Sequence, residues 1–426
     1  MNYSSASKEL LESELSALKA EYQKICDKNY KLDMSRGKPG ADQLDISEEL
    51  LNVLSSNSDC YSENGTDCRN YGIVDGIPEA KKLFADILDI TPDKVIVGGN
   101  SSLNLMYDAI TRAMLYGVPG GNEPWVKQGK IKFLCPCPGY DRHFGICESL
   151  GIEMINIDMT PDGPDMDAVE KYVSEDASIK GIWCVPKYSN PEGVTYSDET
   201  VKRFANLKPA AKDFRIFWDN AYIVHHLTDN GDKLLNIIEE CEKAGNPDMV
   251  YEFTSTSKVS YPGAGVAVIA SSVTNIEHNK KIMGIQTIGH DKLNMLRHVK
   301  YFKDSQGVEN YMKRHAEILR PKFEIVLNAF SKQLGDTGVA EWLSPKGGYF
   351  VSLNVLDGCA KRVVELCKNS GIVLTPAGAA FPYHKDPRDR NIRVAPSYPS
   401  CSDLKDAVDV LCVCVKLACV EKLLNK

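Results

Sequence analysis

Seven short runs rich in β-branched and aromatic residues alternate with helical patterns between residues 94 and 270. Ser102–Tyr116 and Asp198–Leu207 are two of the helical patterns. Parallel strands need crossover connections, and helices on both faces of the sheet supply them, so the alternation predicts an α/β fold. We expect a three-layer large domain with a mostly parallel seven-stranded sheet. Its strands are Lys94–Val97, Ile131–Leu134, Glu153–Ile157, Gly181–Val185, Arg215–Asp219, Met249–Thr254 and Val266–Ala270.

The two ends of the chain show a different pattern. Lys8–Cys26 carries apolar residues at helical spacing. Toward the other end, a long helical stretch leads to a strand-like segment, Gly348–Val355, and a final amphipathic helix, Ser402–Leu424. We expect a smaller α+β domain made of residues 1–45 and 306–426, beside a large domain of residues 46–305.

Charge and composition exclude several classes of protein. The chain has 426 residues, a net charge of -8 and a pI of about 5.6, which argues against nucleic acid as a partner. No apolar run reaches the ~20 residues of a membrane span, and Met1–Leu10 lacks an apolar signal core, so we expect a cytoplasmic protein. The 14 cysteines show no paired zinc spacing, so no metal site is expected.

A lysine follows a run of hydroxyl residues at the end of one expected strand, in Thr254-Ser255-Thr256-Ser257-Lys258. Partial burial at a strand edge lowers the pKa of an amine and leaves it a nucleophile. The hydroxyls of Ser255 and Ser257 can donate hydrogen bonds to a phosphate. Taken alone, an exposed loop lysine beside a serine run fits the stretch equally well.

Another expected strand ends in a carboxylate, in Phe217-Trp218-Asp219, with Tyr222 three residues later. A carboxylate at a strand end can pair with the protonated ring nitrogen of a cofactor, and Tyr222 can donate to a phenolic oxygen of the same ring. Asp219 as the cap of the next helix is an equally good interpretation of this stretch by itself.

Two further strand ends carry small polar residues. Asn190, in Asn190-Pro191, can donate to the same phenolic oxygen, although a plain turn is the better explanation of that pair alone. Asn100, Ser101 and Ser102 precede a helix, whose free N–H groups form a natural phosphate cradle. Ordinary helix capping is the alternative there.

An aromatic residue and an arginine complete the set. Tyr140 follows a strand and can stack on a planar ring, while a core or surface tyrosine is the simpler alternative. Arg393 lies in an apolar strand-like stretch and needs a partner. A substrate carboxylate and a structural salt bridge suit its guanidinium equally. Few cofactors other than pyridoxal phosphate need the whole set together.

With these motifs in this order, the chain resembles a fold-type I pyridoxal-phosphate aminotransferase over nearly its whole length. The resemblance implies a homodimer with shared active sites, in which Tyr71 reaches the phosphate of the neighbouring subunit's cofactor. It also implies that Gly37 lies over the substrate and that Arg393 binds the substrate α-carboxylate. The implied cofactor residues are Asn100, Ser101, Ser102, Tyr140, Asn190, Asp219, Tyr222, Ser255, Ser257 and Lys258.

Two segments indicate which branch of this family the chain resembles. Ser35–Pro39 and Ile288–His298 are similar to a divergent branch of aspartate aminotransferases, also described as class I/II or MocR-like. We expect no DNA-binding domain in front of the enzyme. One departure is that Gly263–Val266 holds no basic residue, where most of the family places an arginine for the phosphate.

The implied reaction is a ping-pong transfer of an amino group from L-aspartate to 2-oxoglutarate, with Lys258 as catalytic base beside Asp219 and Tyr222. A dicarboxylic substrate needs a second cation. The candidates are Arg36, Lys38, Lys292 and Arg297, of which we favour Lys38. Alternatives are an aminotransferase for alanine or an aromatic amino acid, a β-lyase or β-decarboxylase on the same cofactor, and a non-catalytic cofactor sensor. A nicotinamide dehydrogenase is disfavoured, because no G-x-G-x-x-G follows an early strand.

Overall fold

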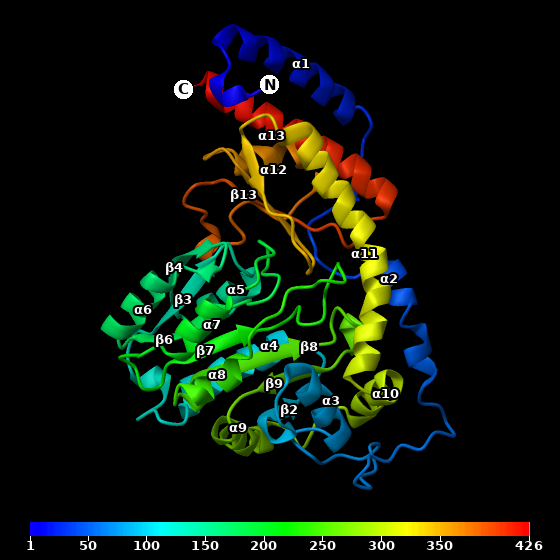
Figure 1. Ribbon diagram of the computed structural model, residues 1–426, viewed down its shortest axis with the longest axis vertical. Coiled ribbons are helices and arrows are strands. Elements are labelled where there is room, and N and C mark those ends of the chain that lie inside the picture. The colour runs from blue at the N-terminus through cyan, green and yellow to red at the C-terminus, as the bar shows by residue number, and fades with distance from the viewer. Residues whose placement is uncertain (426) are drawn as a thin grey trace.

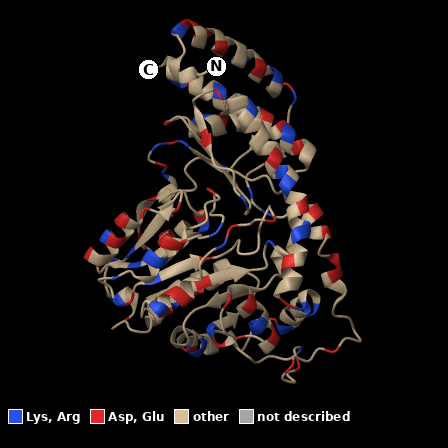
Figure 2. Ribbon diagram, in the orientation of Figure 1, with Lys and Arg blue, Asp and Glu red and all other residues tan. Residues whose placement is uncertain are grey.

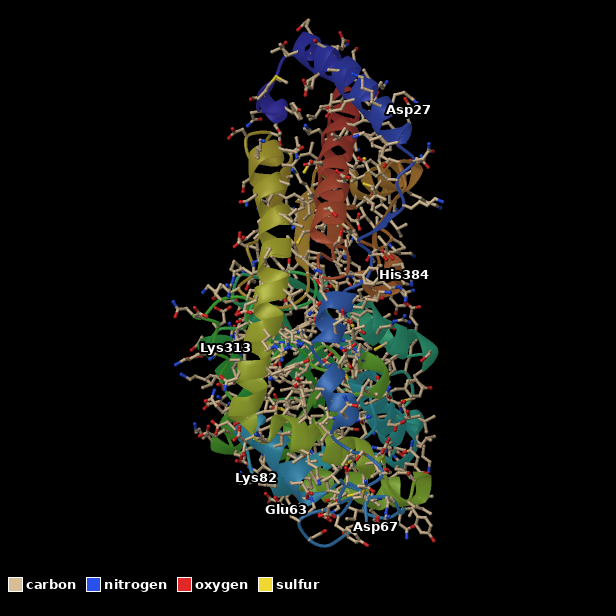
Figure 3. The ribbon with its side chains drawn as sticks, turned by 90° about the vertical axis from the view of Figure 1, so that its right-hand side faces the viewer. Asp27, Glu63, Asp67, Lys82, Lys313 and His384 are labelled. Atoms are coloured by element: carbon tan, nitrogen blue, oxygen red, sulfur yellow. The ribbon has the colours of Figure 1, made fainter. Side chains whose placement is uncertain are left out.

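The structure, a computed structural model, describes residues 1–425. A larger part is built around an eight-stranded sheet, and a smaller part at one end holds the first and last helices (Figure 1). The long helix α11 (Ser305–Leu334) runs from one part to the other, as two views at right angles show (Figures 1 and 3). The α/β fold class expected from the sequence is confirmed.

The large sheet has the strand order β2-β9-β8-β7-β6-β3-β4-β5. Its five central strands are parallel, whereas β9 is antiparallel to both of its neighbours and β5 is antiparallel to β4. All seven expected runs fall on strands, and the two-residue β5 is an eighth that carries too little pattern to be seen. The strands are β2 (Val95–Val97), β3 (Lys132–Cys137), β4 (Glu153–Thr160), β5 (Gly163–Pro164), β6 (Ile179–Cys184), β7 (Arg215–Asp219), β8 (Val250–Ser255) and β9 (Ala267–Ala270).

Helices cover both faces of this sheet, which gives the expected three layers (Figure 1). Two separate apolar cores lie between the sheet and its helices, one on each face. One face is covered by α3 (Pro78–Leu88), α6 (Met166–Glu175), α7 (Asp198–Ala205), α8 (Ile237–Lys243) and α10 (Lys292–Phe302). The other is covered by α4 (Ser102–Tyr116), α5 (Asp141–Ser149) and α9 (Val273–Gln286).

The smaller part has its own core, which joins the chain ends. It contains a three-stranded antiparallel sheet in the order β10-β11-β13 and a parallel pair, β1-β12. Its elements are α1 (Lys8–Cys26), β1 (Leu32–Asp33), β10 (Ala340–Trp342), β11 (Val351–Val355), α12 (Ala360–Asn369), β12 (Ile372–Val373), β13 (Asn391–Val394) and α13 (Cys401–Leu424). The short helix α2 (Ala41–Asp45) lies beside α11 (Figure 1). The domain boundaries at residues 45/46 and 305/306 stay a prediction.

Lysine, arginine and acidic residues are mixed along the outer helices rather than separated by sign (Figure 2). Within residues 1–425, no helix is long and apolar enough to cross a membrane. The same residues contain no group of three or more His, Cys, Asp or Glu side chains placed to hold a metal ion.

Candidate active site

A cavity of about 640 Å³ lies at the C-terminal edge of the parallel strands and is closed by residues of the smaller part. It gathers most of the residues singled out from the sequence. These are Gly37, Lys38, Ser101, Ser102, Tyr140, Asn190, Asp219, Tyr222, Ser255, Ser257, Lys258 and Arg393. Segments separated by hundreds of residues in sequence therefore share one polar cavity.

Lys258 lies three residues beyond the end of β8 and faces two aromatic rings. Its Nζ is 5.3 Å from the centre of the Tyr222 ring and 5.9 Å from that of Tyr349. Burial lowers the pKa of this amine; the nearby Asp219 opposes the shift and Arg393 adds to it. A larger fraction of this amine is therefore unprotonated near neutral pH than for an ordinary lysine.

Asp219 ends β7 and is almost fully buried, with 3% of its surface exposed. Its Oδ2 lies 3.0 Å from Nε2 of His143, whose ring stacks on Trp183 at 4.2 Å. Its Oδ1 has no hydrogen-bond partner in the described part of the chain, although the residue lines the cavity. A buried carboxylate oxygen without a partner is costly, so the cavity is suited to a ligand that donates a hydrogen bond here.

The start of α4 and the end of β8 meet at one side of the cavity. Ser101 caps α4 without using its side chain, so its hydroxyl and the first N–H groups of the helix are available. Ser255 Oγ donates to Ser257 Oγ at 3.0 Å, and Ser257 Oγ donates to the carbonyl of Asn100 at 3.4 Å. Hydroxyls and helix N–H groups together suit a phosphate.

Two expected cofactor residues lie elsewhere. The Asn100 side chain does not line the cavity; it donates to the carbonyls of Pro262 and Gly263, both at 3.4 Å. Its side chain contacts the loop after Lys258, and the expectation that its turn receives a phosphate stays a prediction. Tyr71 is 79% exposed and lies outside the cavity of its own chain, so its predicted role towards a neighbouring subunit stays a prediction.

Arg393 on β13 is held by three side chains. Nη1 donates to Asp141 Oδ1 at 2.9 Å and to Asn190 Oδ1 at 3.4 Å, and Nη2 donates to Thr375 Oγ1 at 3.3 Å. The guanidinium also lies 5.0 Å from the centre of the Phe350 ring. These contacts fix a cation in the cavity wall, on the smaller part and opposite the sheet.

The N-terminal segment brings further cations to the cavity. Gly37 packs so closely on Phe350 that an added Cβ would lie 2.2 Å from the ring, so no larger residue fits there. Lys38 Nζ lies 3.9 Å from the centre of the Tyr398 ring, and Arg36 also lines the cavity. Lys292 does not line it, because its Nζ donates to the carbonyl of Gly72 at 2.8 Å.

Several cavity residues were not anticipated from the sequence. Asp141, Arg142 and His143 occupy the first turn of α5, directly after Tyr140. Because Tyr140 was singled out, the residues that follow it in sequence could also have been considered as site residues. Ala221 lies between Asp219 and Tyr222. Phe350 and Thr375 come from the smaller part, and nothing local marks them. Beyond the expected site residues and Arg36, the cavity is lined by Ser35, Leu103, Asp141, Arg142, Val185, Ala221, Phe350, Val373, Leu374, Thr375 and Pro376. His143 acts on it through its contact with Asp219.

Glu252, on β8 behind Asp219, predicts a pH dependence of stability. It is 4% exposed, and its Oε1 accepts from Asn220 Nδ2 at 2.8 Å. Burial raises the pKa of Glu252 from 4.5 to about 7, and Asn220 opposes the shift. Because the folded value is raised, the fold favours the neutral acid, and this contribution to stability is lost as the pH rises from 4.5 through about 7.

We expect Glu252→Gln, a neutral isostere, to be as stable as wild type near pH 4.5 and more stable by up to about 3 kcal/mol at pH 8. Thermal midpoints of both proteins across this range measure the difference. Glu317→Gln, at an exposed position, is the control and should follow wild type. An unchanged pH profile for Glu252→Gln would contradict the burial argument.

Comparisons with known proteins agree with this architecture. Residues 6–426 match the family described as aspartate amino-transferase. The chain is 45% identical over 408 residues to an aspartate aminotransferase of Corynebacterium glutamicum, covering 96% of this chain and 94% of that protein.

Solved structures extend the comparison to the fold. The crystal structure of an aspartate transaminase from Corynebacterium glutamicum has a TM-score of 0.97, with 43% identity and 99% of each chain covered. An α-aminoadipate aminotransferase of Thermus thermophilus shares the fold at a TM-score of 0.74 and 18% identity, over 91% of this chain and 92% of the other. The chain therefore belongs to the aspartate aminotransferase family and is an aminotransferase of fold type I.

Proposed function

We propose that this aminotransferase binds pyridoxal 5'-phosphate in the cavity and that Lys258 is the residue that holds it covalently. The observation that carries the proposal is the buried, unpartnered Oδ1 of Asp219, in the same cavity as an amine whose pKa is lowered. A protonated ring nitrogen would satisfy that oxygen. Ser101, Ser102, Ser255 and Ser257 would receive the phosphate, and Tyr140 would stack on the ring.

When bound, this cofactor supplies an electron sink for charge that develops at the substrate α-carbon. The residues of the chain perform the remaining tasks. Lys258 would hold the cofactor and move the proton at the substrate α-carbon, which would make it the catalytic base. Asp219, positioned by His143, keeps the ring nitrogen protonated. Arg393 and Asn190 hold the α-carboxylate, and Tyr222 lies where a phenolic oxygen can be bound.

The proposed reaction transfers an amino group from L-aspartate to 2-oxoglutarate. Its support is the 45% identity to an aspartate aminotransferase and the surplus of cations in the cavity wall, where Arg36, Lys38 and Arg142 accompany Arg393. Two dicarboxylic substrates need such a surplus, because each has a second carboxylate to bind. Lys38 remains our preferred partner for it, since its ammonium contacts only a ring and no carboxylate within residues 1–425.

Replacing Lys38 by methionine tests that assignment. We expect KM for aspartate to rise about tenfold, the effect of losing one charged hydrogen bond, while KM for alanine stays unchanged. Steady-state kinetics with both donors measure the two values. Arg393→Lys is the matched comparison: it should weaken both donors, because both carry an α-carboxylate. An equal rise for alanine and aspartate in Lys38→Met would reject Lys38 as the second cation.

The visible absorption of the purified enzyme tests the function itself. We expect a band from lysine-bound cofactor that converts when L-aspartate is added without any keto acid, and returns on addition of 2-oxoglutarate. A band that aspartate leaves unchanged would reject this donor and lead to alanine and aromatic amino acids. Release of ammonia or CO2 would indicate a β-lyase or β-decarboxylase. Failure to bind added pyridoxal phosphate would reject the assignment of Lys258.

We also propose that the active enzyme is a cytoplasmic homodimer. The support is Tyr71, an aromatic side chain that is 79% exposed. The residue after it, Gly72, packs against Gly289 on the segment that precedes α10. An exposed aromatic ring of this kind is suited to contact a second copy. Size-exclusion chromatography with light scattering measures the assembly state, and a monomeric, fully active enzyme would reject the proposal.

A further inference from the structure

The loop that carries Lys258 is hydrogen-bonded to α10. The first part of this helix belongs to the segment Ile288–His298, which is similar to the divergent branch of aspartate aminotransferases. Two buried residues of this helix, Asn294 and His298, lie one turn apart and face the loop; they are 8% and 1% exposed. The loop between Lys258 and β9 contains no basic residue of its own. Its conformation therefore depends on neutral hydrogen bonds.

Asn294 fixes the far end of the loop. Its Nδ2 donates to the carbonyl of Ala264 at 3.0 Å and to that of Gly265 at 2.7 Å, so both hydrogens of the amide are used. Its Oδ1 accepts from Arg297. Directly after this clamped pair, the N–H of Ala267 donates to the carbonyl of Gly99 at 2.7 Å. Asn294 thus also fixes the turn that leads into α4.

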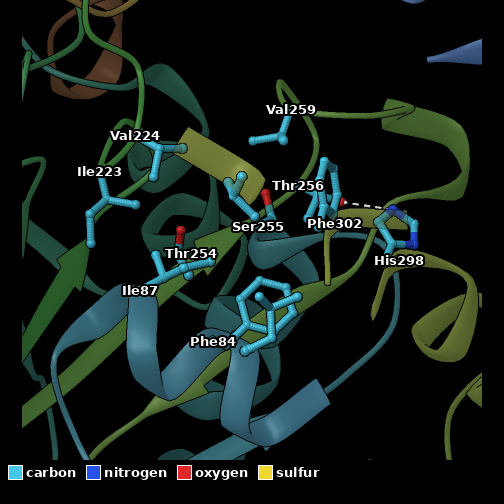
Figure 4. A pocket seen from close by; sticks show the side chains of 12 residues that line it. Phe84, Ile87, Ile223, Val224, Thr254, Ser255, Thr256, Val259, His298 and Phe302 are labelled. Carbon is cyan, nitrogen blue, oxygen red and sulfur yellow. Dashed lines mark hydrogen bonds between the residues drawn. The ribbon is translucent and has the colours of Figure 1, made fainter. Parts of the chain in front are cut away.

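His298 fixes the near end of the loop. Its Nδ1 lies 2.8 Å from the carbonyl of Asn294, which can only accept, so Nδ1 carries the hydrogen and Nε2 is an acceptor. Nε2 lies 2.8 Å from Ser260 Oγ. It also lies 3.4 Å from Thr256 Oγ1, as Figure 4 shows. Thr256 and Ser260 stand two residues before and two residues after Lys258.

These groups form one connected network of hydrogen bonds. The N–H of Val266 donates to Thr256 Oγ1 at 2.9 Å, and Thr256 Oγ1 lies 3.1 Å from Ser260 Oγ. Ser260 Oγ is the donor in that bond, and Nε2 of His298 lies within hydrogen-bond distance of both hydroxyls, where only a neutral imidazole can accept. Burial keeps it neutral, because it lowers the pKa of His298 to about 4.

Packing alone does not hold this region. A cavity of about 20 Å³ lies directly beneath the loop, lined by Thr254, Ser255, Thr256, Val259, His298 and Phe302 among others (Figure 4). A space of about one water molecule next to the strand leaves room for the loop to shift if its hydrogen bonds are lost. The direction of Lys258 Nζ would shift with it.

We propose that Asn294 and His298 are positioning residues, which set the direction of Lys258 and the spacing between its loop and the turn before α4, so that cofactor attachment depends on them. The inference rests on the proposed function, because it takes Lys258 as the attachment point. A residue that only stabilised the fold would change the melting temperature without changing the attached cofactor.

Four variants of the holoenzyme separate these roles. His298→Phe keeps a planar ring but removes the hydrogen-bond acceptor. Ser260→Ala removes the hydroxyl on the other side of the same hydrogen bond. If one of these two variants fails to fold, the other still tests the proposal. His298→Gln can restore an acceptor where Nε2 lies. Leu296→Ala, on the same helix and buried in the apolar core, removes no hydrogen bond to the loop and is the control for stability alone.

Two quantities are measured with pyridoxal 5'-phosphate as the probe: its dissociation constant and the pH midpoint of its visible band. We expect His298→Phe and Ser260→Ala to raise the constant about tenfold and to displace the midpoint, as loss of a hydrogen bond to the loop implies. His298→Gln should recover most of both. Leu296→Ala should lower the melting temperature and leave both unchanged.

Wild-type values in His298→Phe or Ser260→Ala would overturn the inference, and so would equal displacement in Leu296→Ala. If wild type itself forms no visible band with pyridoxal 5'-phosphate, the proposed function fails rather than the positioning role. The two failures are therefore distinguishable in one set of measurements.

Discussion

Replacing Lys258 by alanine is expected to lower turnover at least about 10⁴-fold, because the proposed function gives one residue both the covalent attachment and the proton transfer. The amine is the only lysine nitrogen of residues 1–425 that lines the cavity next to Asp219 with its pKa lowered by burial. Steady-state turnover, with L-aspartate and 2-oxoglutarate at saturation, measures the loss.

Two further variants separate charge from proton transfer. Lys258→Arg keeps a cation in the cavity, but a guanidinium is not deprotonated near neutral pH and cannot act as the base, so it should be as inactive as Lys258→Ala. Lys281→Ala, at an exposed position on α9, should retain wild-type turnover. Retention of more than about 0.01% of wild-type turnover by Lys258→Ala would contradict the expected loss of at least about 10⁴-fold.

The strands that frame this lysine were predictable because each is a short apolar run that ends at a polar residue. Arg215–Asp219 matches β7 at both ends, and Ser102–Tyr116 matches α4. Elements of two residues carry no period that can be recognised, so β5 and the pair β1-β12 were not anticipated. Their pairing is decided by contacts between distant segments rather than by local pattern.

The same limit applies to the site. Lys258, Asp219 and Asn190 were found because strand ends in a parallel sheet meet at one edge. Thr375 and Phe350 come from the smaller part, where no strand-end rule applies, and only the folded chain places them beside Arg393. The contact of the Asn100 side chain with the loop after Lys258 was not predictable for a related reason, since sequence locates a turn but not the direction of its side chain.

The role of His143 could not be read from the sequence either, although it determines how Asp219 acts. A histidine three residues after Tyr140 is as ordinary as any other on an amphipathic helix. Its significance comes from two contacts. Trp183 stacks on the imidazole ring and fixes it, and Nε2 of the ring lies 3.0 Å from Oδ2 of Asp219. One oxygen of the carboxylate is thereby occupied, and the other is left for the cavity.

Asp219→Asn is therefore expected to lower kcat by about 10²- to 10³-fold, the cost of losing one preorganised charge at a reacting group. The amide has the same shape but no negative charge, so it no longer favours a protonated ring nitrogen. The protein should remain folded, because asparagine removes a buried charge without leaving a void. Pre-steady-state conversion by L-aspartate, together with a melting curve, measures both effects.

His143→Asn is compared with Asp219→Asn to separate the orientation of the carboxylate from its charge. It leaves the charge of Asp219 in place but removes the ring that stacks on Trp183, so the carboxylate can turn. A loss of about tenfold, smaller than that of Asp219→Asn, is expected for a group that acts through another. If Asp219→Asn kept a tenth or more of wild-type kcat, a partner other than this carboxylate would have to hold the ring nitrogen. Equal losses in both variants would instead mean that the orientation of the carboxylate matters as much as its charge.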